Sequence, residues 1–316
     1  MSEFELIAKY FTRPASRDDV LLGVGDDAAV LQVPTNRRLV TAVDTIVEGV
    51  HFPIGTDPAA IGYRALAVNL SDMAAMGAEP AWITLSLSLP KSDAQWLDGF
   101  ARGLFQLANR YNIALVGGDT VRGPLSVTVN VMGLVEPDGW LTRGGAKPGD
   151  AIFVTGIPGE AAAGLAVLQS QSAKSVDREA LIAAFLWPEP RVQLGRALRM
   201  LASAAIDVSD GLLADLGHLC AQSGCGAQLD LDLLPVSAAM ESEFAAEECE
   251  RFALSGGDDY ELIFTVPSER VAEIQSALAF DIRYTQVGRM ATGAGVTCLR
   301  AGQPVAIARR GYDHFA

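Results

Sequence analysis

Aspartates recur along this sequence in short motifs that also contain glycine, serine, threonine or asparagine, each motif next to an apolar segment. A carboxylate close to another carboxylate has a raised pKa unless a cation joins the two. The first pair is Asp26-Asp27, and the other acids of this kind are Asp44, Asp72, Asp119, Asp207, Asp210, Asp258 and Asp259. We therefore expect these acids to converge on divalent cations, and we expect the cations to hold a polyphosphate.

The type of ligand indicates the metal. Mg²⁺ prefers one or two carboxylates per ion and completes its shell with waters and phosphate oxygens. Aspartate oxygens suit a hard cation better than histidine or cysteine would, and the chain has only three histidines. The scattered aspartates could thus serve several Mg²⁺ ions.

The usual phosphate-binding loops are absent from the sequence. It contains neither G-x-x-x-x-G-K-[ST] nor a G-x-G-x-x-G after a strand with an acid about 20 residues on. The stretch Gly156-Ile157-Pro158-Gly159 could cradle an anion at the start of a helix, or it could be an ordinary strand-to-helix turn. A nucleotide would therefore have to be held through metals.

Asp72 is the most informative single acid. It lies in a helix expected over 57–76, where its neighbours Val68, Ala75 and Met76 are all apolar. We expect this stretch to be buried, and an unpaired buried carboxylate is strongly destabilising. A metal ligand is the preferred interpretation, and an internal cap or an arginine partner is the alternative.

Length and charge narrow the classes of function. A chain of 316 residues suffices for two domains, and its hydrophobic fraction of 50% allows a large core. With 24 basic and 38 acidic side chains, the net charge is −14. That charge argues against a nucleic-acid partner, but not against a phosphate substrate whose charge is neutralised by metals.

The cysteines and the N-terminus predict a compartment. Cys220, Cys225, Cys249 and Cys298 have neither C-x-x-C nor zinc-site spacing, so we expect free thiols, which fit a reducing cytoplasm. The first five residues lack the basic and apolar regions of a signal peptide. No apolar run reaches the ~18 residues of a membrane span. We therefore expect a cytoplasmic protein with no membrane partner.

Hydrophobic periodicity predicts an α/β layout of strands and helices. Helices are expected over 3–12, 57–76, 93–111, 160–170, 178–187, 190–203, 211–223 and 268–279. Strands are expected over 28–33, 39–47, 81–89, 113–116, 125–135, 151–155, 205–207, 227–230, 260–266, 283–288, 295–299 and 304–308. The stretch 136–150, rich in glycine and proline, is the best domain boundary. It divides the chain into domains 1–137 and 138–316.

Longer motifs follow one another along almost the whole chain. They are Gly-Val-Gly-Asp-Asp-Ala-Ala (23–29), Asp44 with His51-Phe52, the stretch 67–78 around Asn-Leu-Ser-Asp, Gly-Gly-Asp-Thr (117–120), Leu-Thr-Arg (141–143), Ile-Asp-Val-Ser-Asp-Gly-Leu (206–212), Ser-Gly-Gly-Asp-Asp-Tyr-Glu-Leu (255–262) and Gly-Tyr-Asp-His-Phe (311–315). Each motif alone is weak, but the ordered set resembles the thiamine-monophosphate kinases. This family belongs to the superfamily of aminoimidazole ribonucleotide synthetase and selenophosphate synthetase.

The resemblance implies a fold and an assembly. The fold would be α/β (α+β), with the two domains of aminoimidazole ribonucleotide synthetase and mixed sheets packed with helices. Domain 1–137 would bind metal and ATP, and it would pair with its copy in a homodimer. Domain 138–316 would be an α/β domain that completes the active-site cleft.

The resemblance also implies a reaction and its residues. The reaction would be ATP-dependent phosphorylation of thiamine monophosphate to thiamine diphosphate, the last step of thiamine diphosphate biosynthesis. The Mg²⁺ ligands would be Asp27, Asp44, Asp72, Asp119, Asp207 and Asp210. ATP contacts would come from Gly118, Asp119, Arg143 and Ser209, and substrate contacts from His51, Asp258 and Tyr312. Asp44, Arg143 and Asp210 would act in the transfer itself.

Three of these residues have structural alternatives. Arg143 could be a solvated loop arginine, His51 a hydrogen-bonded structural histidine, and Tyr312 an aromatic residue of the core. The chemistry nevertheless agrees with the inventory, because a phosphate monoester is already an anionic nucleophile at pH 7. Such an acceptor needs positioning and charge neutralisation rather than a base.

The sequence departs from the family pattern at two places. Ala42-Val43 precede Asp44, where hydroxyl residues are common in the family, so a metal contact there would need a backbone carbonyl. Asp258 occupies a position that is often glutamate, so its reach toward the thiamine ring is shorter.

Other functions fit less well. A selenophosphate synthetase would need a reactive cysteine near the N-terminus, and the first cysteine is Cys220. A hydrogenase-maturation relative would need a C-terminal cysteine, and the chain ends Asp-His-Phe-Ala. A non-catalytic Ca²⁺- or nucleotide-binding module would gather its acids in one 12-residue loop, whereas these acids run from Asp26 to Asp259.

Overall fold

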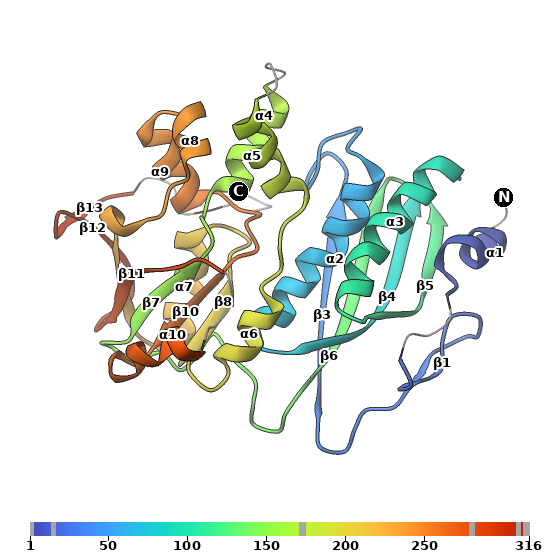
Figure 1. Cartoon of the computed structure of the whole chain (residues 1–316), viewed down its shortest axis with the longest axis horizontal. Coiled ribbons are helices and arrows are strands. Elements are labelled where there is room, and N and C mark those ends of the chain that lie inside the picture. Colours follow the sequence, from blue (N-terminus) through green and yellow to red (C-terminus); the bar gives the residue numbers. More distant parts are fainter. Residues whose placement is uncertain (1–2, 14–16, 171–174, 278–281, 308–310, 312–316) are drawn as a thin grey trace. The chain divides into compact units, whose positions relative to one another are not determined.

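Two compact units make up the chain. The computed structural model describes residues 3–13, 17–170, 175–277, 282–307 and 311. The first unit comprises Met1–Met73 and Ala78–Asp138, and the second comprises Ala74–Gly77 and Gly139–Ala316. Both are mixed α/β units with helices packed on mixed sheets, as the sequence predicted (Figure 1).

A four-stranded sheet is the centre of the first unit, in the order β3-β6-β4-β5. Its strands are β3 (Arg38–Val47), β4 (Glu79–Leu89), β5 (Ala114–Arg122) and β6 (Ser126–Val135). β6 is antiparallel to β3 and β4, whereas β4 and β5 are parallel. Along β4, Leu85 and Leu87 are buried while Ser86 is exposed. Successive side chains of a strand point to opposite faces, so one face of β4 lines the core.

Helices α2 (Pro58–Ala75) and α3 (Ala94–Arg110) lie over one face of this sheet (Figure 1). Their starts follow the expected capping rule, because an aspartate accepts hydrogen bonds from the first free N–H groups. Asp57 accepts from the Ala59 N–H at 3.0 Å, and Asp93 caps α3. Gly77, with φ of 66°, follows the end of α2. The expected helix over 57–76 and its N-cap are confirmed.

The two helices approach so closely that Gly62 of α2 and Gly103 of α3 must both be glycine. A Cβ atom on Gly103 of α3 would lie 1.8 Å from the carbonyl oxygen of Ala59 on α2. No side chain fits at that distance. The contact brings the two backbones together, so the apolar side chains around them are packed tightly.

A small ribbon of β1 (Val20–Leu22) and β2 (Val30–Leu31) precedes the sheet. Asp19 anchors it, because its Oδ1 accepts from the Trp82 indole N–H at 3.0 Å and from Arg17 Nε at 2.9 Å. Burial raises the pKa of Asp19, but the bonds from Arg17 and Trp82 outweigh burial and hold that pKa below its ordinary value. The loop with Asp26 and Asp27 joins the two strands of this anchored ribbon.

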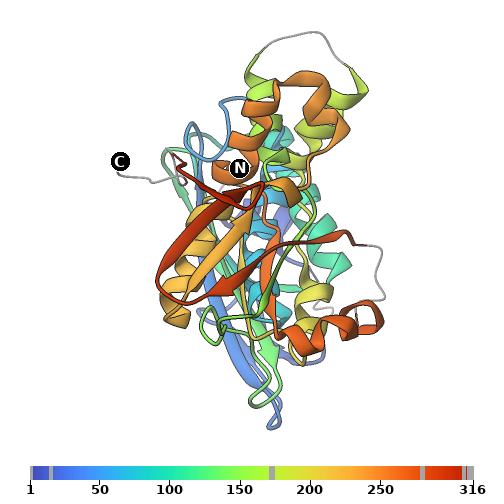
Figure 2. The same ribbon diagram turned by 90° about the vertical axis from the view of Figure 1, so that its left-hand side faces the viewer.

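The second unit contains a seven-stranded mixed sheet in the order β13-β12-β9-β11-β7-β10-β8. Figure 2 shows this unit from the front. The strands are β7 (Ala151–Thr155), β8 (Ala204–Asp207), β9 (Gly226–Asp230), β10 (Leu262–Val266), β11 (Tyr284–Ala291), β12 (Gly295–Arg300) and β13 (Gln303–Val305). Helix α7 (Leu212–Ser223) packs on one face, where Leu216 and Leu219 join Ile152 and Val154 of β7 in the main core. A further helix of this unit, α6, spans Val192–Leu198.

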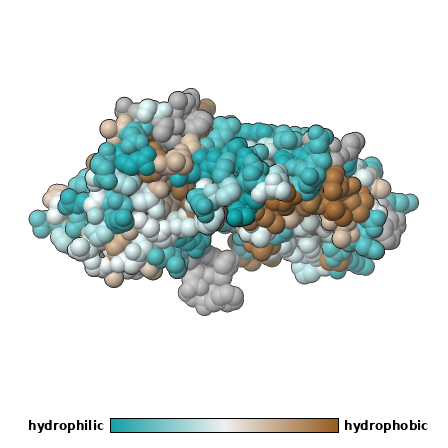
Figure 3. Space-filling model, turned by 90° about the horizontal axis from the view of Figure 1, so that it is seen from below, coloured by the Kyte–Doolittle hydropathy of each residue, from teal (hydrophilic) through white to brown (hydrophobic). Residues whose placement is uncertain are grey.

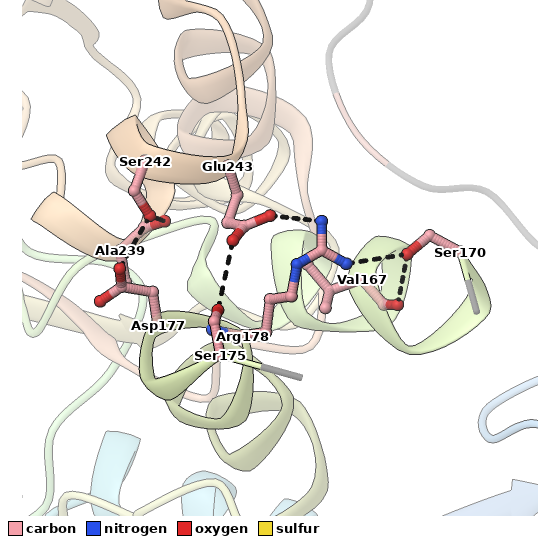
Figure 4. A network of polar contacts seen from close by, with 8 residues as sticks. All are labelled: Val167, Ser170, Ser175, Asp177, Arg178, Ala239, Ser242 and Glu243. Atoms are coloured by element: carbon pink, nitrogen blue, oxygen red, sulfur yellow. Dashed lines mark hydrogen bonds and ion pairs between the residues drawn. The ribbon is translucent and has the colours of Figure 1, made fainter. Parts of the chain in front are cut away.

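Four helices form a separate layer of the second unit, at the top of Figure 2. They are α4 (Glu160–Gln169), α5 (Val176–Leu186), α8 (Ala238–Glu243) and α9 (Ala246–Ser255). Val167, Leu181 and Phe252 belong to their common core. Figure 4 shows the polar network that joins α5 to α8, in which Arg178 Nη2 lies 2.5 Å from Glu243 Oε2.

Several expected elements differ from the structure. The expected helix 3–12 is a turn of α-helix, α1 (Glu3–Leu6), followed by a π-helical turn, η1 (Ile7–Phe11), and the expected helix 268–279 is a 3₁₀ segment, η3 (Ser268–Glu273), followed by α10 (Ile274–Ala277). Helices α8 and α9 have no counterpart among the expected elements. The expected helix 190–203 is shorter, as α6, and the expected strand 28–33 is only the two-residue β2.

Two features of the described residues bear on compartment and redox state. None of the helices in the described ranges is both long and apolar enough to cross a bilayer. All four cysteines are free and buried, which confirms the expectation of free thiols. Burial raises the pKa of the Cys220 thiol to about 11, so this thiol is protonated and unreactive at neutral pH.

The contact between α2 and α3 predicts the effect of a small substitution. Gly103→Ala should destabilise the protein by about 1–3 kcal/mol, because the methyl group overlaps the Ala59 carbonyl and the helices must separate. Urea unfolding measures the change. The matched control is Gly217→Ala in α7, where a Cβ meets nothing within 4 Å and where alanine should stabilise the helix by up to about 1 kcal/mol. Equal midpoints for Gly103→Ala and the parent protein would contradict the packing argument.

Candidate active site

A cavity of about 720 Å³ in the first unit is lined by two of the aspartate motifs. Asp26 and Asp27 enter it from the loop between β1 and β2, and Asp119 enters it from β5. The other lining residues are Ile7, Phe11, Val24, Gly25, Ala28, Ala29, Thr84, Leu85, Leu115, Val116, Gly117, Gly118 and Thr120. Oxygen ligands of this kind suit a hard cation, so the cavity fits the predicted chemistry.

The Gly117-Gly118-Asp119-Thr120 motif lies within β5, not in a turn after it. We expected the strand to end at residue 116, but β5 continues to Arg122 and pairs with β4 in parallel. A Cβ atom on Gly118 would lie 1.9 Å from the Leu85 carbonyl oxygen. Glycine at this position lets β5 approach β4 and continue the sheet, so Asp119 is held by sheet hydrogen bonds.

Asp44 and His51 lie at the end of β3 and in the turn after it. The Asp44 N–H donates to Asn69 Oδ1 at 3.1 Å, which ties β3 to α2. Burial raises the pKa of the Asp44 carboxyl. The Val47 N–H donates to His51 Nδ1 at 3.1 Å, so this ring nitrogen is taken by the backbone.

Asp72 is less buried than the sequence suggested. It is half-buried, as is Met76 one turn later, while Val68 and Ala75 are buried. Residues four apart share one side of a helix, so Asp72 and Met76 mark the side of α2 nearest to solvent. We expected the stretch around Asp72 to be buried, and most of it is, but Asp72 itself is only half-buried. Partial exposure does not conflict with metal binding.

In the second unit, the loop after β8 is shaped by a carboxylate that sequence reasoning missed. Asp215 Oδ2 accepts three consecutive backbone N–H groups, from Ser209 at 3.0 Å, Asp210 at 3.1 Å and Gly211 at 3.2 Å. Burial, followed by the charge of Asp207, raises the pKa of Asp215 to about 7, against the opposing N–H groups. The charges of Asp207 and Asp210 thus act on Asp215, and a cation near them would offset this repulsion.

The Gly257–Glu261 segment pairs with that loop, backbone to backbone. The Asp258 N–H donates to the Ser209 carbonyl and the Tyr260 N–H to the Val208 carbonyl, each at 2.8 Å. The Val208 N–H in turn donates to the Glu261 carbonyl at 2.8 Å. Asp258 therefore lies beside the loop that carries Ser209 and Asp210, so the residues assigned to acceptor and ATP are neighbours here.

Carboxylates of the protein itself occupy the space next to Gly156 and Gly159. Asp259 Oδ2 accepts from the Gly159 N–H at 2.7 Å, and its Oδ1 accepts from the Ala161 N–H at 3.1 Å. A Cβ on Gly156 would lie 1.9 Å from Glu261 Oε1. The first N–H groups of α4 are thus taken by a buried aspartate. This finding decides between the alternatives, because the segment is a strand-to-helix turn and not an open anion cradle.

Two assigned residues remain, Arg143 and Tyr312. Arg143 is exposed on a loop, and its carbonyl accepts from the Ser223 hydroxyl at 3.1 Å. Tyr312 lies outside the described residues. Among the residues that are described, no three His, Cys, Asp or Glu side chains are arranged to hold a metal ion by themselves. Mg²⁺ takes only one or two carboxylates with waters and phosphate, so this finding leaves the ligand set as a proposal.

A sequence signal for Asp215 exists. It stands four residues after Gly211, in the first turn of a helix that follows Ser-Asp-Gly. An acid in the first turn is a favourable partner for free N–H groups. What the sequence could not tell is that the side chain turns back onto the N–H groups of residues 209–211 instead of facing solvent.

Comparison with known proteins finds matches along almost the whole chain. The family model for the AIR synthase related protein, N-terminal domain, matches residues 25–135, and that for the C-terminal domain matches residues 147–298. The thiamine-monophosphate kinase of Escherichia coli K12 is 51% identical over 99% of this chain and 98% of its own length.

Two solved structures extend the comparison. The crystal structure of thiamine-monophosphate kinase from Stenotrophomonas maltophilia K279a has a TM-score of 0.89 and 46% identity, and it covers 96% of this chain and 98% of that chain. The structure of AaThiL complexed with AMPPCP and TMP has a TM-score of 0.80 and 31% identity, with 92% of both chains covered. Fold and sequence agree along the chain.

The raised pKa of Asp215 predicts how stability depends on pH. Between its ordinary value of 3.8 and about 7, the folded protein keeps a proton that the unfolded chain has lost, so rising pH through this window removes stability. Asp215→Asn keeps a hydrogen-bond acceptor but does not titrate. In chelator-treated protein, the melting temperature of Asp215→Asn minus that of the parent should therefore increase from pH 4 to pH 8. A difference that is constant across this range would contradict the shift.

Proposed function

This chain belongs to the thiamine-monophosphate kinase family, and we propose that it transfers the γ-phosphoryl group of ATP to thiamine monophosphate, giving thiamine diphosphate and ADP. The observation that carries the proposal is identity of 51% along 99% of the chain with the E. coli kinase. The AaThiL structure, which holds an ATP analogue and TMP, supports direct transfer between the two ligands.

The acceptor chemistry suits the residues present. The phosphate of thiamine monophosphate is anionic at pH 7 and attacks without a general base, so the enzyme must mainly align two anions and offset their charge. Arg143 would clamp the transferring phosphoryl group with its planar guanidinium. The Ser223 hydroxyl bond to the Arg143 carbonyl holds the backbone of that loop.

The donor set fits Mg²⁺. Asp27 and Asp119 line one cavity, and Asp207 and Asp210 raise the pKa of Asp215 by their charge. The proposed ligands are Asp27, Asp44, Asp72, Asp119, Asp207 and Asp210. When bound, the ions would offset the charge of the polyphosphate and of the developing transition state. Asp44 and Asp210 would thereby act in the transfer together with Arg143.

The proposed substrate contacts fall into two groups, one for ATP and one for thiamine monophosphate. Gly118, Asp119, Arg143 and Ser209 would contact ATP, and His51, Asp258 and Tyr312 would contact thiamine monophosphate. Support for Gly118 comes from its place in the cavity wall next to Asp119. The four buried free thiols stay reduced in the cytoplasm, which is where we place the enzyme.

We also propose a homodimer formed by the first unit. Figure 3 shows hydrophobic surface gathered over this unit, at the right of the view. On β3, Leu39 and Val43 are 51% and 58% exposed, and exposed apolar groups of this kind mark interfaces. Light scattering tests the proposal: Val43→Glu should lower the mass from dimer toward monomer, and Val176→Glu, at a valine of α5 that is 83% exposed, should not. A monomeric parent protein would overturn it.

The reaction itself has a direct test. ADP release from Mg-ATP should require thiamine monophosphate, and unphosphorylated thiamine should support little turnover, because its hydroxyl is not an anionic nucleophile and no base serves it. Aminoimidazole precursors are tested in the same assay as a third candidate acceptor. Equal turnover with thiamine would refute the assigned acceptor.

Asp72 provides a test of the metal assignment. Asp72→Asn should keep the melting temperature near that of the parent, because the residue is half-buried, while Mg²⁺-dependent turnover falls by at least about tenfold. The control is Asp98→Asn at an exposed aspartate of α3, which should change neither quantity. Unchanged Mg²⁺ dependence and rate in Asp72→Asn would remove this residue from the ligand set.

A further inference from the structure

Tyr260 contacts the side chain of Asp258, to which the proposed function assigns a contact with thiamine monophosphate. The Tyr260 hydroxyl donates a hydrogen bond to Asp258 Oδ1 at 3.1 Å. Tyr260 is 8% exposed, while Asp258 is half-buried. We propose that Tyr260 is a positioning residue, which holds the Asp258 carboxylate in the orientation that binds the acceptor substrate. This inference rests on the proposed function.

The backbone of both residues is strained. Asp258 has φ of 72° and Tyr260 has φ of 52°, in the left-handed region that residues with a side chain rarely adopt and that is unusual for a bulky aromatic. Such conformations persist only where the surroundings impose them, and they cluster at functional sites. Two of them within three residues therefore point to a segment whose side-chain directions are imposed.

The first restraint is the loop that carries Ser209. The Asp258 N–H and the Tyr260 N–H are both bonded to carbonyls of that loop at 2.8 Å. A Cβ on Gly257 would lie 2.5 Å from the Ser209 carbonyl oxygen, so the two backbones are in direct contact. The position of the segment relative to Ser209 is thereby fixed.

The second restraint comes from the residues that alternate with Asp258 and Tyr260. Asp259 is bonded to the first N–H groups of α4, and Glu261 accepts from Arg191 Nε at 2.6 Å and from the Thr155 hydroxyl. Because the backbone is held from both sides and the Tyr260 side chain is buried, the hydroxyl has little freedom to move. The rotation of the Asp258 carboxylate is then the variable that Tyr260 restricts.

The consequence concerns the acceptor only. A carboxylate aimed at a cationic ring binds it best when its orientation is set before binding, because no rotational freedom is then lost. Without the hydroxyl, Asp258 can rotate away from the orientation that binds substrate. The effect should appear in the affinity for thiamine monophosphate and not in that for Mg-ATP.

Tyr260→Phe removes this hydroxyl and keeps the ring. We expect the KM for thiamine monophosphate to rise about three- to tenfold, in line with the net loss of one ordinary hydrogen bond. The KM for Mg-ATP and the melting temperature should remain close to those of the parent. Tyr284→Phe is the matched control, because Tyr284 lies on β11 of the same unit and its ring contacts Phe153; its KM values should not change.

Asp258→Ala and the double variant complete the test. Asp258→Ala should raise the same KM, and adding Tyr260→Phe to it should have no further effect. If Asp258→Ala raises this KM but Tyr260→Phe does not, the positioning role is wrong while the proposed function stands. If Asp258→Ala has no effect, the acceptor contact of Asp258 is wrong, and the inference falls with it. A lower melting temperature with both KM values raised in Tyr260→Phe would assign the residue a structural role instead.

Discussion

A carboxylate taken out of water needs N–H groups, a cation or a proton, and the candidate site depends on how this need is met. Asp215 meets it with three backbone N–H groups and Asp259 with two. Glu261 meets it with Arg191. These buried acids are thus parts of the scaffold. They turn loop backbone into fixed structure, and the less buried acids beside them are presented from that structure.

The difference between the buried scaffold acids and the less buried acids explains why only some of the many acids of this chain are available to a ligand. Burial raises the pKa of Asp259 well above its ordinary value in spite of its two N–H partners. The two hydrogen bonds therefore hold Asp259 in place more than its charge does. Asp26, Asp27 and Asp119 instead line an open cavity. Acids in such a cavity can exchange water for metal and phosphate oxygens, which is what a phosphoryl-transfer site requires.

Most elements could be predicted from the sequence, and the exceptions have local causes. β7 and the helix after Asp57 follow apolar periodicity and capping, which are local signals. β10 begins at Leu262 instead of residue 260, because Tyr260 is held in a left-handed conformation by contacts distant in sequence. Helices α8 and α9 are short, and their apolar residues have a partner only once α4 and α5 lie beside them.

The sequence by itself determined the family and the kind of reaction, and it supplied candidate residues for that reaction. The ordered motifs carry the resemblance to the family, and aspartate oxygens with few histidines indicated a hard cation. The tertiary structure alone decided which acids are scaffold and which face a cavity. Asp72 and Asp259 both belong to motifs with small residues, yet the first is half-buried on α2 and the second is buried against α4. Burial and N–H partners are properties of the packed chain, because they depend on segments a hundred residues apart.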